Sequence, residues 1–258
     1  SGMMDCKNAL VESNGDFDLA VDILRKKGQK VAAKRADRQA MEGVVIARNN
    51  SNSSKAVLIS LNCETDFVAK NDDFSTLANT ILGLAIESNV NTKDELLQLS
   101  FSDAFNVGEK ITEQSGIIGE KIEISSFEKI DAVRVISYNH PGNQIASLVG
   151  LTVDAEDEGK QVAMQVAAMN PIALDQSSVS QEVIDREMEV GKELAIQEGK
   201  PVEMAEKIAK GRLNKFFKET TLLNQAFIRD NKKSVQQFLK DTNPDLTVTD
   251  FKRYSLSI

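Results

Sequence analysis

The hydrophobic pattern of the chain changes its period near residue 65, from that of a strand to that of an amphipathic helix. Val57, Ile59 and Leu61 alternate with their neighbours over a β-favouring run, which predicts a strand over residues 55–63. Asn71, Asp72 and Asp73 are residue types that cap and begin helices. One apolar stripe then follows at helical spacing: Phe74, Leu77, Ala78, Ile81, Leu84 and Ala85. We therefore expect a strand, a short turn over residues 65–70, and a helix that packs across the strand.

The turn contains an aromatic side chain next to an acid, Phe67 beside Asp66. Most Phe residues in folded proteins are buried, so spacing alone favours Phe67 as core under the following helix. The alternative hypothesis is that the turn presents Phe67 to a partner.

Composition narrows the class of protein. A length of 258 residues exceeds the ~150 residues of one average domain. The net charge of −8, from 31 basic and 39 acidic residues, argues against direct binding to nucleic acid, which needs basic patches. No stretch approaches the ~20 apolar residues of a membrane span. We expect a cytoplasmic globular protein, without membrane contact, that meets a basic or mixed protein partner.

Few residues in the chain could carry covalent chemistry. Cys6 and Cys63 show no metal-type spacing, and His140 is the only histidine. A Cys63–His140 thiolate pair is the best enzymatic hypothesis, but a Cys that ends a strand is more typical of a small buried hydrophobe. Phosphate-binding and dinucleotide-binding glycine motifs are absent from the sequence. We therefore expect no cofactor, no metal and no enzymatic activity of the chain's own.

The region before residue 43 is predicted to be helical. Met3, Cys6, Ala9 and Leu10 share one face of a first helix. A second helix is expected from Asp16 to a stop at Gly28. The Lys- and Arg-rich run 30–38 has little apolar face and is interpreted as a separate solvated connector, or else as a basic contact for an acidic partner surface.

The remainder alternates between strands and helices, which predicts an α+β fold with antiparallel sheets. Residues 43–48 are expected to pair with 55–63 as a hairpin, and 89–119 to contain two short helices. The other predicted strands are 120–127, 132–138, 144–153 and 246–254. The other predicted helices are 156–169, 180–198, 201–217 and 234–240. Because 180–198 and 201–217 are joined by only a short turn, they should form an antiparallel helical hairpin.

Two separated motifs resemble the signatures of the elongation factor Ts family. They are Asn62-Cys63-Glu64-Thr65-Asp66-Phe67-Val68-Ala69 and Gly2-Met3-Met4-Asp5-Cys6-Lys7-Asn8-Ala9-Leu10. The resemblance implies a ubiquitin-associated-like helical module over 1–38, whose first helix is absent from this sequence. It also implies a core α+β subdomain over 39–154 that carries the turn. A second α+β subdomain is implied over 155–258, with a coiled-coil hairpin inserted at about 180–217.

The resemblance also implies a function, that of a guanine-nucleotide exchange factor whose partner is elongation factor Tu. In the family, the turn matched by Thr65, Asp66, Phe67 and Val68 dislodges Mg²⁺ in the partner. Met3 and Met4 match docking residues, although helix core is the alternative for both. His140 matches a position near the partner contact, but its flanking residues differ from the commoner pattern. A homodimer, with two copies of each protein in the complex, is left open. The alternative function is a scaffold or chaperone-like binder that leaves nucleotide affinity unchanged.

Overall fold

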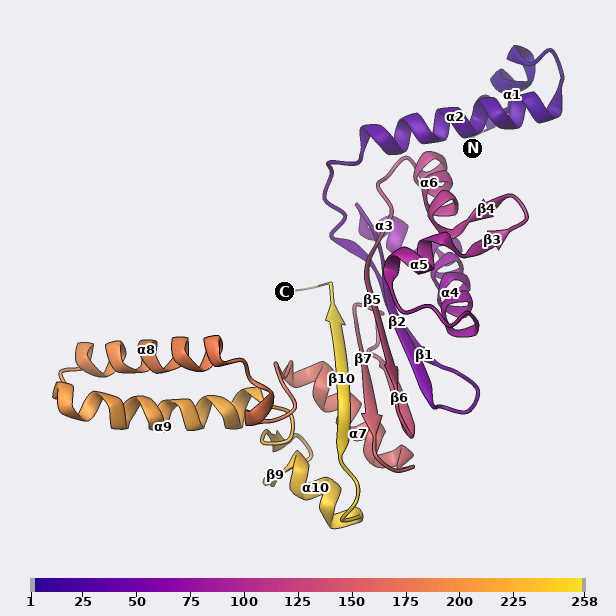
Figure 1. The fold of residues 1–258 in the computed structure, drawn as a ribbon. Coiled ribbons are helices and arrows are strands. Elements are labelled where there is room, and N and C mark those ends of the chain that lie inside the picture. The colour runs from indigo at the N-terminus through magenta and orange to yellow at the C-terminus, as the bar shows by residue number, and fades with distance from the viewer. Residues whose placement is uncertain (1–2, 257–258) are drawn as a thin grey trace. The chain divides into compact units, whose positions relative to one another are not determined.

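The computed structural model describes residues 3–256, which divide into two compact units (Figure 1). The first unit comprises residues 3–129, 139–146 and 254–256, and the second comprises 130–138 and 147–253. Both units mix helices with strands, as the predicted α+β class requires. The domain boundaries expected after residues 38 and 154 stay predictions.

An antiparallel hairpin organises the first unit. Strand β1 (Glu42–Asn49) pairs with β2 (Lys55–Cys63) in a register that runs from Glu42 opposite Cys63 to Asn49 opposite Ala56. Strand β5 (Glu123–Asp131) lies on the other side of β2, so the sheet order is β1-β2-β5. Both predicted strands of the hairpin are confirmed. The position of β2 in the middle of the sheet explains why eight of its nine residues are buried.

Helix α4 (Asp72–Glu87) covers this hairpin. The side chain of Asn71 caps its first turn by accepting a hydrogen bond from the amide of Asp73 at 2.8 Å. The predicted stripe is confirmed with one change, because Leu82 is buried whereas Leu84 is only partly so. The helix packs against β1 and β2, and a single helical turn, α3 (Asp66–Ala69), connects it to the sheet.

Helix α1 (Met3–Glu12) precedes one long helix, α2 (Phe17–Lys34), so the stop predicted at Gly28 and the separate run over 30–38 are wrong. Gly28 has no C-cap role. It lies where α2 crosses α6 (Val107–Ile118), directly against Gly116. Two glycines at a crossing let two helix backbones approach closely. The glycine that suggested a helix end is therefore a packing contact within a continuous helix.

The chain between α4 and β5 contains the two short helices that were predicted, α5 (Lys93–Gln98) and α6. A small hairpin of β3 (Ser100–Ser102) and β4 (Phe105–Asn106) joins them. Helix α6 begins with a capping box between Asn106 and Glu109 and ends at Gly119, whose φ is 80°. This left-handed residue turns the chain so that Glu120 and Lys121 run back toward the end of β2.

The second sheet has the order β10-β7-β6, from β10 (Val248–Ser255), β7 (Ile145–Leu151) and β6 (Arg134–Asn139). In the second unit, buried residues of β7 and α7 (Glu156–Met169) form a core with those of α10 (Val235–Thr242). The remaining short elements of this unit are η1 (Gln176–Ser178), β8 (Ala226–Phe227) and β9 (Asp230–Ser234).

Helices α8 (Gln181–Gln197) and α9 (Val202–Thr220) form a hairpin, in which the two helices lie side by side in Figure 1. Small residues let them pack closely, since a Cβ on Gly191 would lie 3.2 Å from Ala209. Five large apolar side chains stay at least 41% exposed: Val190, Leu194, Ile196, Val202 and Met204. Among the helices of residues 3–256, none combines the length and the apolar character needed to span a membrane.

The α2–α6 crossing predicts an asymmetric effect of two similar substitutions. A Cβ on Gly116 would overlap the backbone of Gly28, whereas a Cβ on Gly28 would lie 3.6 Å from the Cα of Gly116, an ordinary contact. Gly116→Ala should therefore destabilise the protein by roughly 1–3 kcal/mol. Gly28→Ala should stabilise it by about 0.5–1 kcal/mol through helix propensity. Urea unfolding followed by circular dichroism measures both variants, and equal effects would show that the crossing does not have this geometry.

Candidate functional site

The candidate site is the helical turn α3, which follows directly after β2. Thr65 is its N-cap, and the Thr65 hydroxyl oxygen accepts a hydrogen bond from the amide of Val68 at 3.5 Å. This cap fixes the helical phase of the residues that follow. Val68 and Ala69, three and four positions after the cap, pack on the core, while Phe67 is exposed and the Asp66 side chain is half-exposed. A helix of four residues is not stable alone, so other contacts must hold it.

Glu120 holds the start of the turn. One of its carboxylate oxygens accepts hydrogen bonds from the amides of Glu64 and Thr65, both at 3.1 Å. The other accepts the hydroxyl proton of Thr65 at 2.6 Å. Three bonds from one carboxylate thus fix the backbone and the side chain at the point where the strand becomes a helix.

Glu64 makes the reverse connection. Its carboxylate accepts a hydrogen bond from the amide of Lys121 at 2.6 Å, and both its oxygens lie 2.9 Å from one guanidinium nitrogen of Arg35. Arg38 adds a longer contact at 3.4 Å. The side chain is 12% exposed, and burial opposes its ionisation, but the Lys121 amide and Arg35 outweigh this and lower the pKa of Glu64. We call Glu64, Glu120 and Arg35 the clamp.

Phe67 is 84% exposed, so the expectation from spacing that it belongs to the core is wrong. Full burial of a Phe side chain contributes about 1.5–3 kcal/mol, and this position gives up nearly all of that. Beside it, Asp66 pairs with Lys70 at 2.6 Å, and the hydrogen bond from Lys70 lowers the pKa of Asp66. The turn therefore presents an apolar ring and an ionised carboxylate to solvent.

Cys63 is fully buried at the end of β2, and its thiol donates a hydrogen bond to the carbonyl oxygen of Thr65 at 3.2 Å. Burial, and then the negative charge of Glu120, raise the pKa of Cys63 to about 12. Such a thiol stays protonated at neutral pH, so the structure favours a packing role over nucleophilic chemistry.

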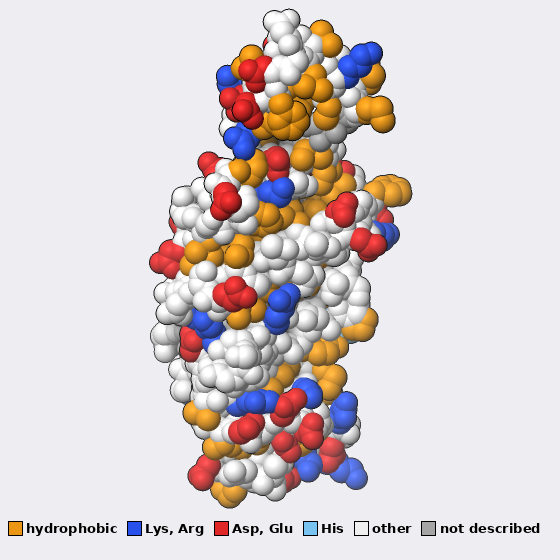
Figure 2. All heavy atoms as spheres, turned by 90° about the vertical axis from the view of Figure 1, so that its right-hand side faces the viewer, with side chains coloured by type: hydrophobic (Ala, Val, Ile, Leu, Met, Phe, Trp, Pro, Cys, Tyr) orange, Lys and Arg blue, Asp and Glu red, His pale blue; other side chains and the backbone are white. Residues whose placement is uncertain are grey.

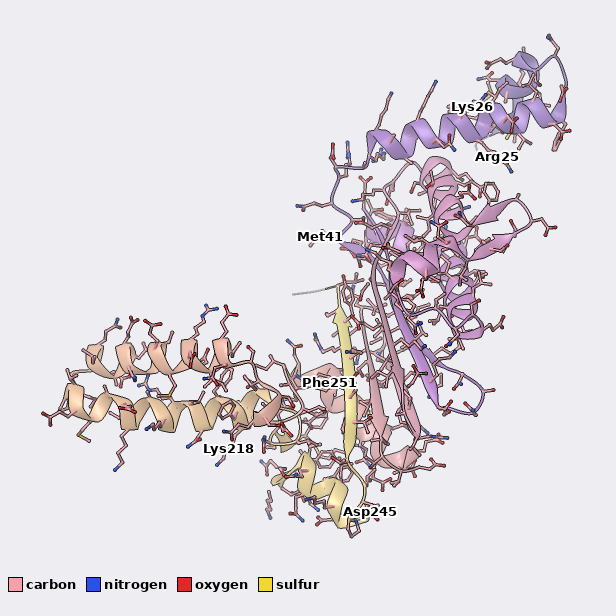
Figure 3. The ribbon with its side chains drawn as sticks, in the orientation of Figure 1. Arg25, Lys26, Met41, Lys218, Asp245 and Phe251 are labelled. Carbon is pink, nitrogen blue, oxygen red and sulfur yellow. The ribbon has the colours of Figure 1, made fainter. Side chains whose placement is uncertain are left out.

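Met3 and Met4 lie on α1 and are 89% and 63% exposed, so neither side chain belongs to the core of the helical module. On the face drawn in Figure 2, the helices α1 and α2 leave hydrophobic atoms at the surface among charged ones. Exposed Phe17 at the start of α2 adds to these. Figure 3 labels two cations farther along α2, Arg25 and Lys26.

His140 is exposed in the tight turn between β6 and β7. This turn is attached to the outer edge of β1. The side-chain amide of Asn139 accepts from the amide of Ala47 at 2.7 Å and donates to its carbonyl at 2.9 Å. The amide of Val45 donates to the carbonyl of Asn143 at 2.7 Å. His140 and the α3 turn are thus both mounted on the β1–β2 hairpin.

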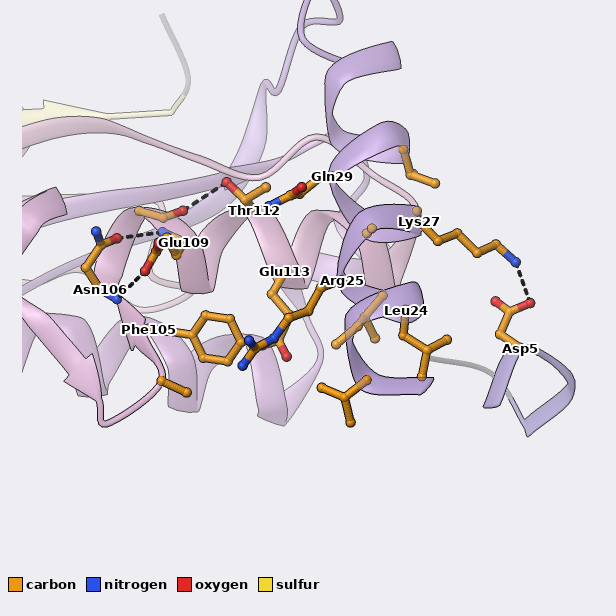
Figure 4. A pocket seen from close by; sticks show the side chains of 18 of the residues that line it. Asp5, Leu24, Arg25, Lys27, Gln29, Phe105, Asn106, Glu109, Thr112 and Glu113 are labelled. Atoms are coloured by element: carbon orange, nitrogen blue, oxygen red, sulfur yellow. Dashed lines mark hydrogen bonds and ion pairs between the residues drawn. The ribbon is translucent and has the colours of Figure 1, made fainter. Parts of the chain in front are cut away.

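A cavity of about 860 Å³ lies elsewhere in the first unit, between α2 and the α6 region (Figure 4). Its charged groups already pair with each other or with neighbours: Arg25 stacks 4.6 Å from the ring centre of Phe105, and Lys27 pairs with Asp5 at 2.6 Å. A smaller pocket of about 200 Å³ lies between α3 and residues 142–144. Across residues 3–256, no group of three or more His, Cys, Asp and Glu side chains is placed to hold a metal ion.

Sequence reasoning missed the clamp residues Glu120 and Arg35 and the edge contact of Asn139. Each acts on a residue far away in the chain, 55 positions in the case of Glu120 and Thr65, and no local pattern marks such a pairing. Of the three clamp residues, only Glu64 lies within the motif that the sequence analysis singled out, directly before the turn.

The lowered pKa of Glu64 predicts a pH-dependent contribution to stability. A carboxyl group whose pKa is lower in the folded chain stabilises the fold above its ordinary value of 4.5, and this stabilisation is lost as the pH falls through the lowered pKa. Glu64→Gln should therefore lower the Tm at pH 7 by about 3 °C, a gap that closes in strongly acidic buffer. Thermal melts across this range measure it, with Glu189→Gln on exposed α8 as control. A gap that is the same at every pH would contradict this origin.

Comparison with known proteins places these residues in a family. A protein-family model described as Elongation factor TS matches residues 64–257. A protein named elongation factor Ts from Christiangramia forsetii is 53% identical over 259 residues, which cover 99% of this chain and 93% of the relative. Proteins of the same name from Flavobacterium psychrophilum and Porphyromonas gingivalis are 49% and 44% identical, with coverage of 99% and 100% of this chain and 93% of each relative. The chain therefore belongs to the elongation factor Ts family of translation elongation factors.

Proposed function

We propose that this chain is a guanine-nucleotide exchange factor that acts on elongation factor Tu and is not itself an enzyme. The observation that carries the proposal is the exposure of Phe67, at 84%, on a turn that the clamp holds in place. A large apolar side chain presented in this way is suited to be the buried anchor of an interface. Family membership supports elongation factor Tu as the partner.

The exchange mechanism follows from linkage between two binding events. A factor speeds GDP release when it binds the nucleotide-free GTPase more tightly than the GDP form, and by the same ratio GDP weakens binding of the factor. GDP is held mainly by phosphate contacts and by a Mg²⁺ ion. In the proposal, Phe67 enters between elements of the partner that orient the Mg²⁺, and their displacement weakens the hold on GDP.

The neighbouring residues have distinct roles in this proposal. Asp66, ionised and half-exposed, accepts hydrogen bonds from donors that the displacement uncovers in the partner, in exchange for its present contact with Lys70. Thr65 and Val68 fix the turn, one as its cap and the other through the core. Met3 and Met4 supply docking energy, and exposed His140 provides a further contact.

The decisive experiment measures release of fluorescently labelled GDP from purified elongation factor Tu, with unlabelled GDP in excess. An exchange factor accelerates release in proportion to its concentration until the partner is saturated. A scaffold or chaperone-like binder would form the complex but leave the release rate unchanged, and that result would overturn the proposal.

Phe67→Ala should lower the stimulated release rate by more than about tenfold, because it removes the proposed anchor. The fold should be intact, since an 84% exposed side chain contributes little to the core. Stopped-flow release and circular dichroism check the two parts. Val133→Ala, at a side chain 69% exposed, is the matched control and should act as wild type. Wild-type exchange by the Phe67 variant would remove Phe67 from the mechanism.

The double variant Met3→Ala with Met4→Ala should instead raise the half-saturating factor concentration by about fivefold or more, with the maximal rate within about twofold of wild type. These residues are proposed to dock on the partner without displacing the Mg²⁺. Titration of the release rate against factor concentration separates the two quantities. Met169→Ala, at a side chain 47% exposed, is the control. An unchanged half-saturation point would show that α1 does not dock.

A further inference from the structure

Arg35 connects two parts of the first unit that the proposed function uses separately. It is the C-cap residue of α2, where its amide donates to the carbonyls of Ala32 and Ala33. Its guanidinium lies 2.9 Å from both oxygens of Glu64, the residue directly before the cap of α3. One side chain thus links the end of the long helix to the root of the turn.

A second connection between α2 and the turn runs through α6. Gly28 and Gly116 hold the middle of α2 against α6, and α6 ends at Gly119. The next two residues, Glu120 and Lys121, are those that bond to the root of the turn. Two contacts on one helix, in its middle and at its end, fix both its position and its direction relative to α3.

Helix α2 also packs against α1, which carries Met3 and Met4. The proposed docking residues Met3 and Met4 and the exposed Phe67 are therefore connected through α2, and Arg35 makes the direct contact between α2 and the residue before the α3 cap. Its ion pair is mostly shielded from solvent, with side-chain exposures of 31% for Arg35 and 12% for Glu64. Besides its contribution to stability, this pair fixes the end of α2 relative to the residue before the α3 cap.

We propose that Arg35 is a positioning residue for nucleotide exchange, which sets the direction in which Phe67 is presented relative to the docking surface on α1. This inference rests on the proposed function. A factor that docks through α1 can insert Phe67 productively only if Phe67 is held at a fixed position relative to α1. A small misplacement of a functional side chain loses much of its contribution to the rate. Arg35 does not touch the partner or the nucleotide in this scheme. It acts through Glu64.

Arg38 supplies a matched control in the same segment. It carries the same charge and reaches the same carboxylate, but at 3.4 Å and with a side chain 62% exposed. If only the positive charge near Glu64 mattered, Arg35 and Arg38 would have similar effects. If the close contact of Arg35 matters, only its loss should change exchange.

The test measures stimulated release of labelled GDP from elongation factor Tu over a range of factor concentrations. Arg35→Met should lower the maximal rate by about tenfold, with the half-saturating concentration within about twofold of wild type. Arg38→Met should leave both quantities within about twofold of wild type. Arg35→Lys keeps the charge but replaces the guanidinium with an ammonium group on a different stem, which changes the close contact with Glu64, so its maximal rate should lie between those of wild type and Arg35→Met.

Three results would overturn the inference. The first is a wild-type maximal rate for Arg35→Met. The second is an equal loss of maximal rate in Arg35→Met and Arg38→Met. The third is an Arg35→Met variant in which only the half-saturating concentration changes. If Arg35→Met does not fold by circular dichroism, Arg35→Lys decides: a folded variant with a lowered maximal rate supports the inference, and a wild-type rate overturns it. A wild-type chain that does not accelerate release would instead overturn the proposed function, and this inference with it.

Discussion

The first unit depends on a reciprocal pair of hydrogen-bonded carboxylates. Glu120, after α6, binds the amides of Glu64 and Thr65, and Glu64, after β2, binds the amide of Lys121. Burial opposes ionisation of Glu64, but the hydrogen bond from the Lys121 amide and the guanidinium of Arg35 outweigh it and lower the pKa of this carboxyl group. The end of a central strand is thereby fixed to the loop that leaves α6. A helix of one turn is not stable alone, so these bonds add to the Thr65 cap and the core packing of Val68 and Ala69 in holding α3 in one conformation.

The consequence is a pre-organised aromatic side chain. Because Thr65 caps the turn, Val68 and Ala69 face the core, and Phe67 must face solvent. The exposure of Phe67 lowers the stability of the unbound protein. A partner that buries the Phe67 side chain gains the corresponding hydrophobic free energy on binding. An anchor already held in place also loses less conformational entropy when it binds. Such a side chain suits the proposed role of an interface anchor.

Sequence patterns predicted what local periodicity controls. The strands of the β1–β2 hairpin, the cap at Asn71 and helix α7 lie where alternation, helical stripes and capping residues placed them. One error arose where a distant residue determines the local structure. Gly28 has the sequence features of a helix stop, but α2 continues because Gly28 packs on Gly116. Spacing and the usual burial of Phe predicted Phe67 in the core, whereas the Thr65 cap orients α3 so that Phe67 faces solvent. This orientation could be deduced only once the turn was known to be helical. The family motif located the turn, yet its partners Glu120 and Arg35 could not be deduced from one sequence.

Site-specific photo-crosslinking would show whether Phe67 enters elongation factor Tu as proposed. A variant with p-benzoylphenylalanine in place of Phe67 would be irradiated in complex with elongation factor Tu, and crosslinked peptides would be identified by mass spectrometry. We expect crosslinks to the partner's nucleotide-binding domain in the nucleotide-free complex, and fewer of them when excess GDP is added, as linkage requires. A stable complex in which position 67 forms no crosslink to elongation factor Tu would show that Phe67 does not enter the partner.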